Sequence, residues 1–596
     1  MTRFSYAATG HTSVVCVALS CLLTGVTLAA LTSSGDVVVT DRPYMRHDGG
    51  TDATIASCSS DATTPEPFGE GGGNRMQNEP AVAINPRNTQ VIVASANDSC
   101  TSVTIVDGWL GFYVSRDGGA TWLNSLNPGY RTDTSTEGRQ SPIFGSASNT
   151  GDPLLDWDND NRLFIGGVAF NRIVTNASGV VTPGNGHIIV STWQDDPASP
   201  LGLDYLRTAI VGEGTPSSFF RGRFNDKPSL RVDDWPLSPH SGNVYVSWTL
   251  YPGVSGREQI HFARSTDHGV SFSRPIKVSP QVFSAQGSDI AVAPDGTVYV
   301  AWRQFDTDVR GVDDAIVIAR STDAGETFGE PYIVRTIRPY DRSDRYLSGQ
   351  TTVDCGDGPL ECVSHFKFHR TAALPQTVAD GQGNVYITWE QLVLSTDDGD
   401  TYHPDGQATA VVTRSTDRGR TWSDPARIDP TGAGHQWWPN IEFDRTTSQL
   451  VAIYYDSRED PSYGSNRPPG NTAAGTSPCY SAPECNVLNT FMAASADGIS
   501  WTRTKVSTVG HQPEYEIWSN REDVFHGDYL GIDAAGGIAF GVWTDNRDVP
   551  PGVDIREPDN DGFDVLQCRP DASSPDFCAN AGGLNQNIYG ARVIVP

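Results

Sequence analysis

Hydrophobic residues along this chain occur in short runs that recur in a fixed order. In each repeat a polar residue precedes a short apolar run, and a turn with Asp, Asn or Gly leads to a longer run that contains aromatic residues. Runs of this length, separated by such turns, are typical of β-strands. The longer runs lie at residues 91–96, 163–170, 244–248, 298–302, 385–389, 450–455 and 538–543.

A third and a fourth run follow these pairs. The third is clearest at 259–264, 315–320 and 410–414, and 331–334 is an example of the fourth. Four antiparallel strands per repeat make a β-propeller blade. We therefore predict an all-β fold, a single β-propeller of seven four-stranded blades, with six blades as the alternative. The seventh repeat lacks a fourth run, and we expect residues 36–40 near the N-terminus to supply it, closing the ring and removing exposed edges.

A phrase of the form Ser-x-Asp-x-Gly-x-Thr/Ser-Trp/Phe recurs after the third run. It occupies residues 115–122, 265–272, 321–328 and 415–422, and a copy at 495–501 is one residue shorter. A carboxylate at the third position can accept backbone N–H groups across a tight turn, and Gly permits a positive φ. We interpret the aspartates of the phrase as structural: Asp117, Asp267, Asp323, Asp417 and Asp497. Residues 395–402 also match it, but they lie before the third run, so we interpret them as a loop.

The phrase resembles the Asp-box, or BNR repeat, of sialidases and related secreted β-propellers. The resemblance implies a propeller whose boxes lie away from the active site. Sialidases bind the sugar carboxylate with three arginines and use a Tyr–Glu nucleophile and an Asp acid/base. The resemblance therefore suggests Arg172, Arg303, Arg458 and Arg547 for the arginines, and Tyr454, Tyr455 or Tyr529 with Glu390 for the nucleophile.

Two departures from the sialidase pattern weaken an exo-α-sialidase activity. Sialidase catalytic domains have six blades, whereas seven repeats are counted here. Sialidases also carry an arginine in an aromatic-Arg-Ile/Leu-Pro phrase before the first box, and neither 41–43 nor 337–339 matches it in sequence and position. A broader glycan-cleaving hydrolase with two carboxylates remains open.

The candidate site lies on the face with the longest loops, 336–374, 456–486 and 545–585, because long loops on a rigid scaffold commonly carry binding residues. The first residue of each inner strand should point at the central channel, and all are polar: Glu79, Asp152, Asp226, Asp289, Gln376, Asn440 and Asp528. Crowded carboxylates and arginines favour shifted pKa values. We predict catalytic roles for Asp152, Asp226, Glu390 and Asp528, and substrate binding by Arg172, Arg303, Arg458, Arg547, His435 and Trp437.

Composition and the N-terminus place the chain outside the cell. Its formal charge of −29 argues against nucleic acid and anionic membranes as partners. Arg3, the apolar run 13–31 and small residues after it predict a signal peptide over 1–34, with an uncleaved anchor as the alternative. Residues 35–78 then form an N-terminal segment with the ring-closing strand, and 79–596 the propeller. We expect a secreted monomer, extracellular or periplasmic.

Eight cysteines remain after the signal, and an even number in an exported chain predicts disulfides. Short spacings favour Cys355–Cys362, Cys479–Cys485 and Cys568–Cys578, which leaves Cys58 with Cys100. No cofactor is expected. A structural calcium stays open at Asp156, Asp158 and Asp160, although we interpret this stretch as a turn because it lacks the Gly and Glu of an EF-hand loop.

The sequence thus predicts a secreted, sialidase-like β-propeller that acts as a glycoside hydrolase on extracellular glycans or glycoproteins at the channel mouth. The alternative is a propeller that binds glycans or proteins without catalysis.

Overall fold

The computed structural model describes the strands and short turns of the chain and part of its longer loops. The described residues are 31–40, 43–59, 76–101, 108–171, 174–175, 181–182, 185–215, 223–252, 258–280, 284–305, 314–339, 373–393, 407–430, 432–461, 463, 487–511, 513, 526–548 and 586–596. Within them, the helical segments are α1 (Ala53–Ser59), α2 (Thr136–Gln140) and the 3-10 turn η1 (Ser99–Thr101). None of the helices formed by these residues is both long and apolar enough to cross a membrane.

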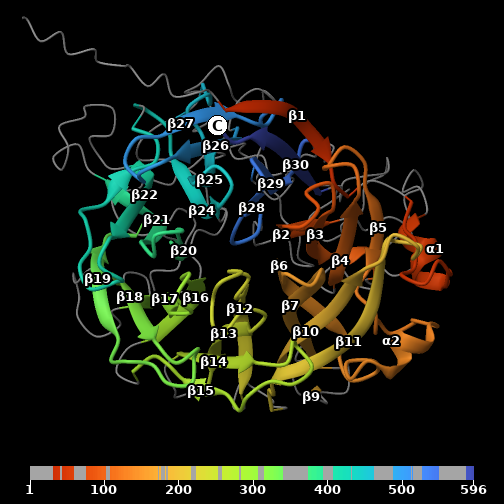
Figure 1. Cartoon of the computed structure of the whole chain (residues 1–596). Helices are drawn as coiled ribbons and strands as arrows, with labels where there is room; N and C mark the ends of the chain where they lie inside the picture. The colour runs from red at the N-terminus through yellow and green to blue at the C-terminus, as the bar shows by residue number, and fades with distance from the viewer. Residues whose placement is uncertain are drawn as a thin grey trace, which may run out of the picture.

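The strands form antiparallel sheets, mostly four-stranded, that stand around a central axis (Figure 1). The first sheet contains β2 (Gln77–Ile84), β3 (Ile92–Asp98), β4 (Trp109–Ser115) and β5 (Leu123–Leu126). The next two units share an eight-stranded sheet through the single parallel bridge Gly186↔Phe224. Their strands are β6 (Asn149–Trp157), β7 (Arg162–Asn171), β10 (Asn185–Asp195), β11 (Leu203–Gly212), β12 (Phe224–Val232), β13 (Val244–Tyr251), β14 (Gln259–Ser265) and β15 (Ile276–Lys277).

The remaining sheets continue this order. They contain β16 (Ser284–Val292), β17 (Val298–Phe305), β18 (Asp314–Ser321) and β19 (Tyr332–Ile337); β20 (Gln376–Ala379), β21 (Val385–Val393), β22 (Gln407–Ser415) and β23 (Ala426–Arg427); and β24 (Gln436–Asp444), β25 (Gln449–Asp456), β26 (Asn489–Ser495) and β27 (Thr502–Lys505). The last sheet contains β28 (Gly531–Ala535), β29 (Ile538–Asp545), β30 (Asn587–Ile594) and β1 (Thr32–Val38). A small hairpin, β8 (Val174–Thr175) with β9 (Val181–Thr182), lies apart from these sheets.

The first strand of each unit is the innermost, and these strands contact one another in chain order. β2 contacts β6, and the contacts continue through β12, β16, β20 and β24 to β28, which returns to β2. Figure 1 shows the same order around the central space. Among the described residues, inner strands from distant parts of the sequence therefore lie side by side around the central space.

Burial of the second strands holds neighbouring sheets together. Trp248, Trp302, Trp389 and Trp543 all come from these strands and are almost completely buried. Each lies in an apolar cluster, and the cluster around Trp389 also contains residues of β16 and β18 in the preceding sheet. Removing such rings from water is the main favourable term in folding, so the aromatic runs of the sequence become the contacts between sheets.

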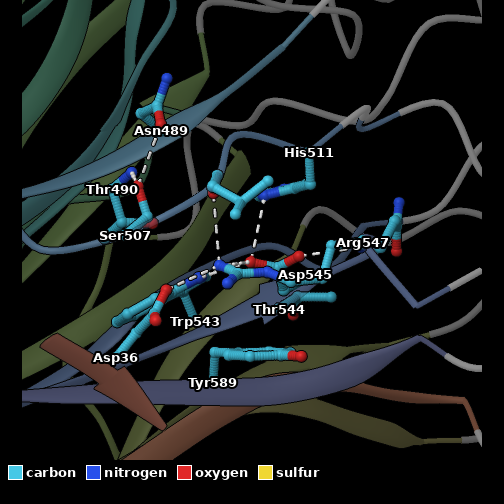
Figure 2. A network of polar contacts seen from close by, with 12 residues as sticks. Asp36, Asn489, Thr490, Ser507, His511, Trp543, Thr544, Asp545, Arg547 and Tyr589 are labelled. Atoms are coloured by element: carbon cyan, nitrogen blue, oxygen red, sulfur yellow. Dashed lines mark hydrogen bonds and ion pairs between the residues drawn. The ribbon is translucent and has the colours of Figure 1, made fainter. Parts of the chain in front are cut away.

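The predicted N-terminal strand pairs with the end of the chain. β1 runs antiparallel to β30, with Asp36 opposite Ala591 and Val38 opposite Tyr589. Asp36 also accepts hydrogen bonds from the backbone N–H (2.8 Å) and hydroxyl (2.7 Å) of Thr508 and forms an ion pair with Arg547 at 2.9 Å. Figure 2 shows Asp36 in this network beside β1. The pairing of chain ends, predicted for residues 36–40, is confirmed and begins earlier, at Thr32.

The predicted pairing of Cys58 with Cys100 is also confirmed. The bond joins α1 to η1 across a sequence separation of 42 residues. The other three predicted pairs, and the look-alike phrase at 395–402, lie outside the described residues.

The repeated Ser-x-Asp-x-Gly phrases form the expected turns. Asp323 accepts hydrogen bonds from the backbone N–H (2.9 Å) and hydroxyl (2.6 Å) of Thr327. Gly325 has a φ of 77°, and a Cβ there would lie 2.5 Å from the ring of Phe262 in the neighbouring sheet. Phe328 packs edge-on against Phe262, with centroids 4.9 Å apart. The phrase therefore fixes a turn and also anchors one sheet against the next.

Replacing Asp323 with Ala is expected to lower the Tm by a few degrees at neutral pH, because it removes the acceptor that closes this turn. Burial opposes the shift, but hydrogen bonds from Ser321 and Thr327 lower the pKa of Asp323 to about 2. A depressed pKa gives stability that is present above the ordinary carboxyl pKa and is lost as pH falls through the folded value. Thermal melts should therefore show the deficit at pH 7 and a smaller one near pH 2.5. Asp424→Ala, at an exposed carboxylate paired with Arg335, is the control and should change Tm little.

Candidate functional site

Most of the described inner strands have a β-bulge near their start. Register shifts occur in β2, β6, β12, β16 and β24 within a few residues of the start of each strand. The bulge residue has a positive φ, 54° at Glu79, 56° at Asp152 and 47° at Lys227. This backbone region is unfavourable for residues with a side chain, and such strain is concentrated at functional sites. The bulges therefore mark this end of the channel as a place to look for function.

The carboxyl groups of Asp152 and Asp226 are hydrogen-bonded to each other at this end of the channel. Burial raises the pKa of Asp152 to about 7, and the charge of Glu79 adds to the rise, while Lys227 opposes it. Burial and the charge of Asp152 likewise raise the pKa of Asp226 to about 7. Both side chains keep a partly exposed edge. Two carboxyl groups in contact titrate as a pair, so near neutral pH they share one proton.

Lys227 connects this pair to the last sheet. Its ammonium group forms an ion pair with the carboxylate of Asp528, and its backbone N–H donates to Asp152 at 3.1 Å. Gly527 has a φ of 98°, and a Cβ there would lie 3.0 Å from the side chain of Glu79. The segment before β28 therefore passes close to β2, which brings Asp528 beside residues that precede it by hundreds of positions.

Asn97, at the end of β3, binds two members of the cluster. Its Nδ2 donates to Glu79 Oε2 at 2.7 Å, and its Oδ1 accepts the backbone N–H of Asp152 at 2.8 Å. One amide side chain therefore fixes the carboxylate from β2 and the backbone that carries the carboxylate from β6.

Tyr529 follows Asp528 and lies in the wall of a central cavity. Its hydroxyl is buried and makes no hydrogen bond among the described residues. Burial raises its pKa well above the ordinary value, and the negative charges of Glu79, Asp152, Asp528 and Asp226 add to the rise. The hydroxyl is therefore protonated at neutral pH and lies close to the acidic cluster.

The central cavity has a volume of about 100 Å³, and Asp152, Lys227 and Tyr529 lie in its wall. Deeper in the channel, Arg231 of β12 binds Glu442 of β24 at 2.6 Å. Figure 1 shows β12 and β24 across the central space from each other, so this ion pair spans the channel. Burial and the charge of Glu442 raise the pKa of nearby Asp533 to about 7. The channel thus has a second charged layer below the first.

The predicted catalytic residues divide into two groups. Asp152, Asp226 and Asp528 come together, with Lys227 between Asp528 and the other two. Glu390 is fully buried at the end of β21, where it accepts the backbone N–H of Ala373 at 2.7 Å. Of its suggested tyrosine partners, Tyr454 donates to Asp429 at 2.9 Å and Tyr455 to the carbonyl of Thr544 at 2.6 Å.

The predicted arginines are paired within the sheets. Arg303 binds Asp314 at 2.8 Å and covers Phe305, and Arg458 binds both Asp429 and Asp456. Arg547 binds Asp545 at 2.7 Å as well as Asp36. Arg172 lies outside the described residues. The structure does not bring the described arginines together as a carboxylate clamp.

Two of the residues predicted to bind substrate are not at the surface. Trp437 and His435 are both completely buried, and their rings stack on each other with centroids 5.0 Å apart. His435 Nδ1 accepts the backbone N–H of Ala408 at 3.1 Å. Trp437 therefore presents no exposed ring face to a substrate, because the ring is part of the core between sheets.

The acidic turn at 158–161 and the box turn at 265–272 bring together the group of metal-type ligands found among the described residues: Asp158, Asp160 and His268. Arg162 binds Asp158 at 3.0 Å and Asp160 at 3.2 Å, and His268 Nδ1 lies 3.1 Å from Asp158. Asp158 Oδ1 also accepts the backbone N–H groups of residues 160 and 162. The turn interpretation is confirmed, with an arginine beside the carboxylates.

Lys227, Asn97, Arg231 and Glu442 were not predicted as site residues. The sequence carries one signal for the bulges, since Glu79, Asp152, Lys227 and Trp438 all have a positive φ and all precede Pro. A repeated X-Pro at the start of the inner strands could have drawn attention to position 227.

Comparisons with known proteins do not assign the chain to a family. No protein-family model and no curated protein matches it. Among solved structures, an ulvan lyase bound to its ligand is 12% identical, with a TM-score of 0.39, over 80% of this chain and 93% of that one. The GH93 α-L-arabinofuranosidase of Fusarium graminearum is 10% identical, with a TM-score of 0.38 over 66% and 92%. The sialidase of Trypanosoma rangeli is 11% identical, with a TM-score of 0.34 over 67% and 56%.

Proposed function

We propose that the chain is a secreted, seven-bladed β-propeller, closed by β1, that hydrolyses glycosidic bonds of extracellular glycans at the acidic end of its channel. The closed order of inner-strand contacts supports the blade count, and the Cys58–Cys100 bond supports export. The Asp152–Asp226 pair carries the enzymatic part of the proposal, because two coupled carboxyl groups that titrate near pH 7 form an acid/base group suited to neutral pH.

The pair acts as one group. Carboxylates that work separately on a glycosidic bond stand roughly 5 Å or more apart, and a hydrogen-bonded pair leaves no room for a sugar between them. The proton shared by Asp152 and Asp226 is therefore assigned to the leaving-group oxygen as the glycosidic bond breaks. The nucleophile must come from elsewhere in the cluster.

Tyr529 is the proposed nucleophile. Its hydroxyl has no hydrogen-bond partner among the described residues. The negative charges of Glu79 and Asp528 act on it electrostatically. As its oxygen bonds to the anomeric carbon, its proton passes to one of these carboxylates, and the leaving oxygen takes the proton of the pair. Water then attacks the anomeric carbon of the glycosyl-tyrosine and gives a proton to the pair, while the departing oxygen of Tyr529 takes back its proton from the carboxyl group that had accepted it, so that all groups are restored.

The pH dependence tests this assignment. Because the pair must hold a proton, kcat/KM should decrease about tenfold per pH unit once the pH exceeds roughly 7. The assay is hydrolysis of a panel of p-nitrophenyl glycosides, including a sialoside, by the purified mature chain between pH 5 and 9. Turnover that stays constant to pH 9 on a cleaved substrate would remove the pair from the acid role, and no turnover on any glycoside would reject the hydrolase.

A non-catalytic glycan-binding or protein-binding propeller is the second candidate. The ion pair Lys227–Asp528 and the bonds of Asn97 hold the cluster in one arrangement, as in a preformed binding surface. Retention on a glycan array without turnover would favour this candidate.

A further inference from the structure

The charges around the cavity determine which sugars its acidic end can accept. Among the described residues that line the cavity, five are acidic and two are basic. Both basic residues are already paired, Lys227 with Asp528 and Arg231 with Glu442. Glu79 and Asp226 add further carboxyl groups at the same end. The described wall therefore has more carboxyl groups than cationic groups, and both of its cationic groups are already bound to carboxylates.

A sugar with its own carboxylate would be repelled at this wall. Sialic acid recognition needs cationic forks that bind the carboxylate, and Arg303, Arg458 and Arg547 are each bound to carboxylates elsewhere. Like charges that meet in a partly buried space interact strongly because water screens them poorly. Acidic sugars are therefore the least suitable class for this site.

A protonated amine fits the same wall. An ammonium group has three N–H donors and no acceptor. The Asp152–Asp226 pair offers carboxyl oxygens, and Tyr529, which lines the same cavity, offers a buried hydroxyl without a partner among the described residues. This hydroxyl is an observation independent of the acidic groups, and it supplies a neutral acceptor in the same wall.

We propose that the acidic end of the channel binds a saccharide that carries a protonated amino group, such as a glucosamine oligomer, at Asp152, Asp226 and Tyr529. This rests on the proposed function of the same site, whose substrate class it specifies. The ammonium group donates N–H groups to carboxyl oxygens of the pair that do not carry the shared proton, so the pair keeps the proton that the proposed hydrolysis needs.

The experiment compares three probes on the full mature chain at pH 6.5 by isothermal titration calorimetry. They are the tetramer of β-1,4-glucosamine, its fully N-acetylated counterpart, and 3′-sialyllactose. The amino tetramer should bind at least tenfold more tightly than the acetylated one, and sialyllactose should show no measurable binding. Equal affinity for the first two, or tighter binding of sialyllactose, would overturn the inference.

Variants distinguish binding of the amino tetramer at this site from nonspecific electrostatic attraction of the tetramer to an acidic protein. Asp226→Asn and Tyr529→Phe should each weaken binding of the amino tetramer at least fivefold, and the second keeps the test available if the first does not fold. Asp424→Asn removes an exposed carboxylate that pairs with Arg335 and should leave the affinity unchanged. Affinity that drops equally in all three variants, or in none, would contradict the assignment.

The outcomes also separate this inference from the hydrolase. If the amino tetramer binds in the expected way but is not cleaved, the substrate class holds and the enzymatic proposal fails. If a neutral or sialylated glycoside is cleaved in a reaction that Asp226→Asn abolishes, the hydrolase holds and the inferred substrate class fails.

Discussion

Asp226→Asn is expected to reduce kcat/KM on a cleaved glycoside by about 10²–10⁴-fold, the usual contribution of a positioned acid/base group. Asn keeps the shape of the neutral carboxyl group but cannot deliver its proton. Asp152→Asn should have a similar effect, and the double variant little more than either, because residues that act as one unit are not additive. Turnover within twofold of wild type would remove the pair from the mechanism.

Stability should change in the opposite direction, which distinguishes this loss from misfolding. The pKa of Asp226 is raised in the folded state, mainly by burial and then by Asp152. A raised carboxyl pKa means that ionisation destabilises the fold as pH rises above the ordinary carboxyl value. The Asn variant should therefore unfold at a Tm equal to or above that of wild type at pH 8. Asp424→Asn is the matched control, with no expected change in turnover.

Arg547→Ala should destabilise the fold by about 2–3 kcal/mol. Asp545 is completely buried and would lose its guanidinium partner; it would keep His511, whose Nδ1 lies 3.4 Å away (Figure 2), the indole N–H of Trp543 at 3.0 Å and the backbone N–H of residue 547 at 2.9 Å. Breaking a fully buried ion pair costs roughly 3–5 kcal/mol, and partial exposure of Arg547 places the estimate lower. The substitution also removes the ion-pair partner of Asp36. It further removes the cation–π contact of Arg547, whose guanidinium carbon lies 4.0 Å from the ring centroid of Tyr589. In the variant, the amide hydrogens of β1 should therefore exchange faster than in wild type, and this increase should be larger than the increase in β30.

Chemical denaturation and hydrogen exchange measure these effects. Burial alone would raise the pKa of Asp545, but His511 and Arg547 outweigh it and hold that pKa below its usual range. The stability gained is present above the ordinary carboxyl pKa and lost in acid, so the deficit of Arg547→Ala should shrink as pH falls below about 4. Arg335→Ala, in an exposed pair with Asp424, should cost under about 1 kcal/mol. A deficit at Arg547 as small as this control would contradict the structural role.

The sheets and turns could be predicted from local patterns. Period-two runs define a strand wherever they occur, and the turn at Asp323 depends only on residues within the same phrase. The pairing of β1 with β30 followed from one missing strand in the last repeat. These features need no knowledge of how the units are placed in space.

The site could be predicted only in part. The sequence showed that the inner strands start with polar residues. Three of these residues, Asp152, Asp226 and Asp528, do lie close together. The partner of Asp528 could not be derived, because Lys227 lies 301 residues away and reaches it through the curvature of the ring. A cationic side chain at this position decides the charge balance of the cluster.

Side-chain direction explains the predictions that failed. The bulge in β24 lies between Trp437 and Asn440, and the ring of Trp437 is completely buried in the core. Arg458 follows Asp456 by two residues and binds it, and Arg547 binds Asp545 in the same way. A carboxylate so near in sequence is a local partner for an arginine. Each of these arginines therefore binds its neighbouring aspartate and does not join a sialidase-type clamp.

The central claim is that the channel brings Asp152 and Asp226, from different sheets, into one proton-sharing pair. Infrared difference spectroscopy across a pH titration tests it directly, with the Asp226→Asn spectrum subtracted from that of wild type. The account predicts protonated carboxyl bands that disappear with a midpoint near pH 7 in wild type, and the loss of part of this signal in the variant. Carboxyl bands that all disappear near pH 4, unchanged by the substitution, would contradict it.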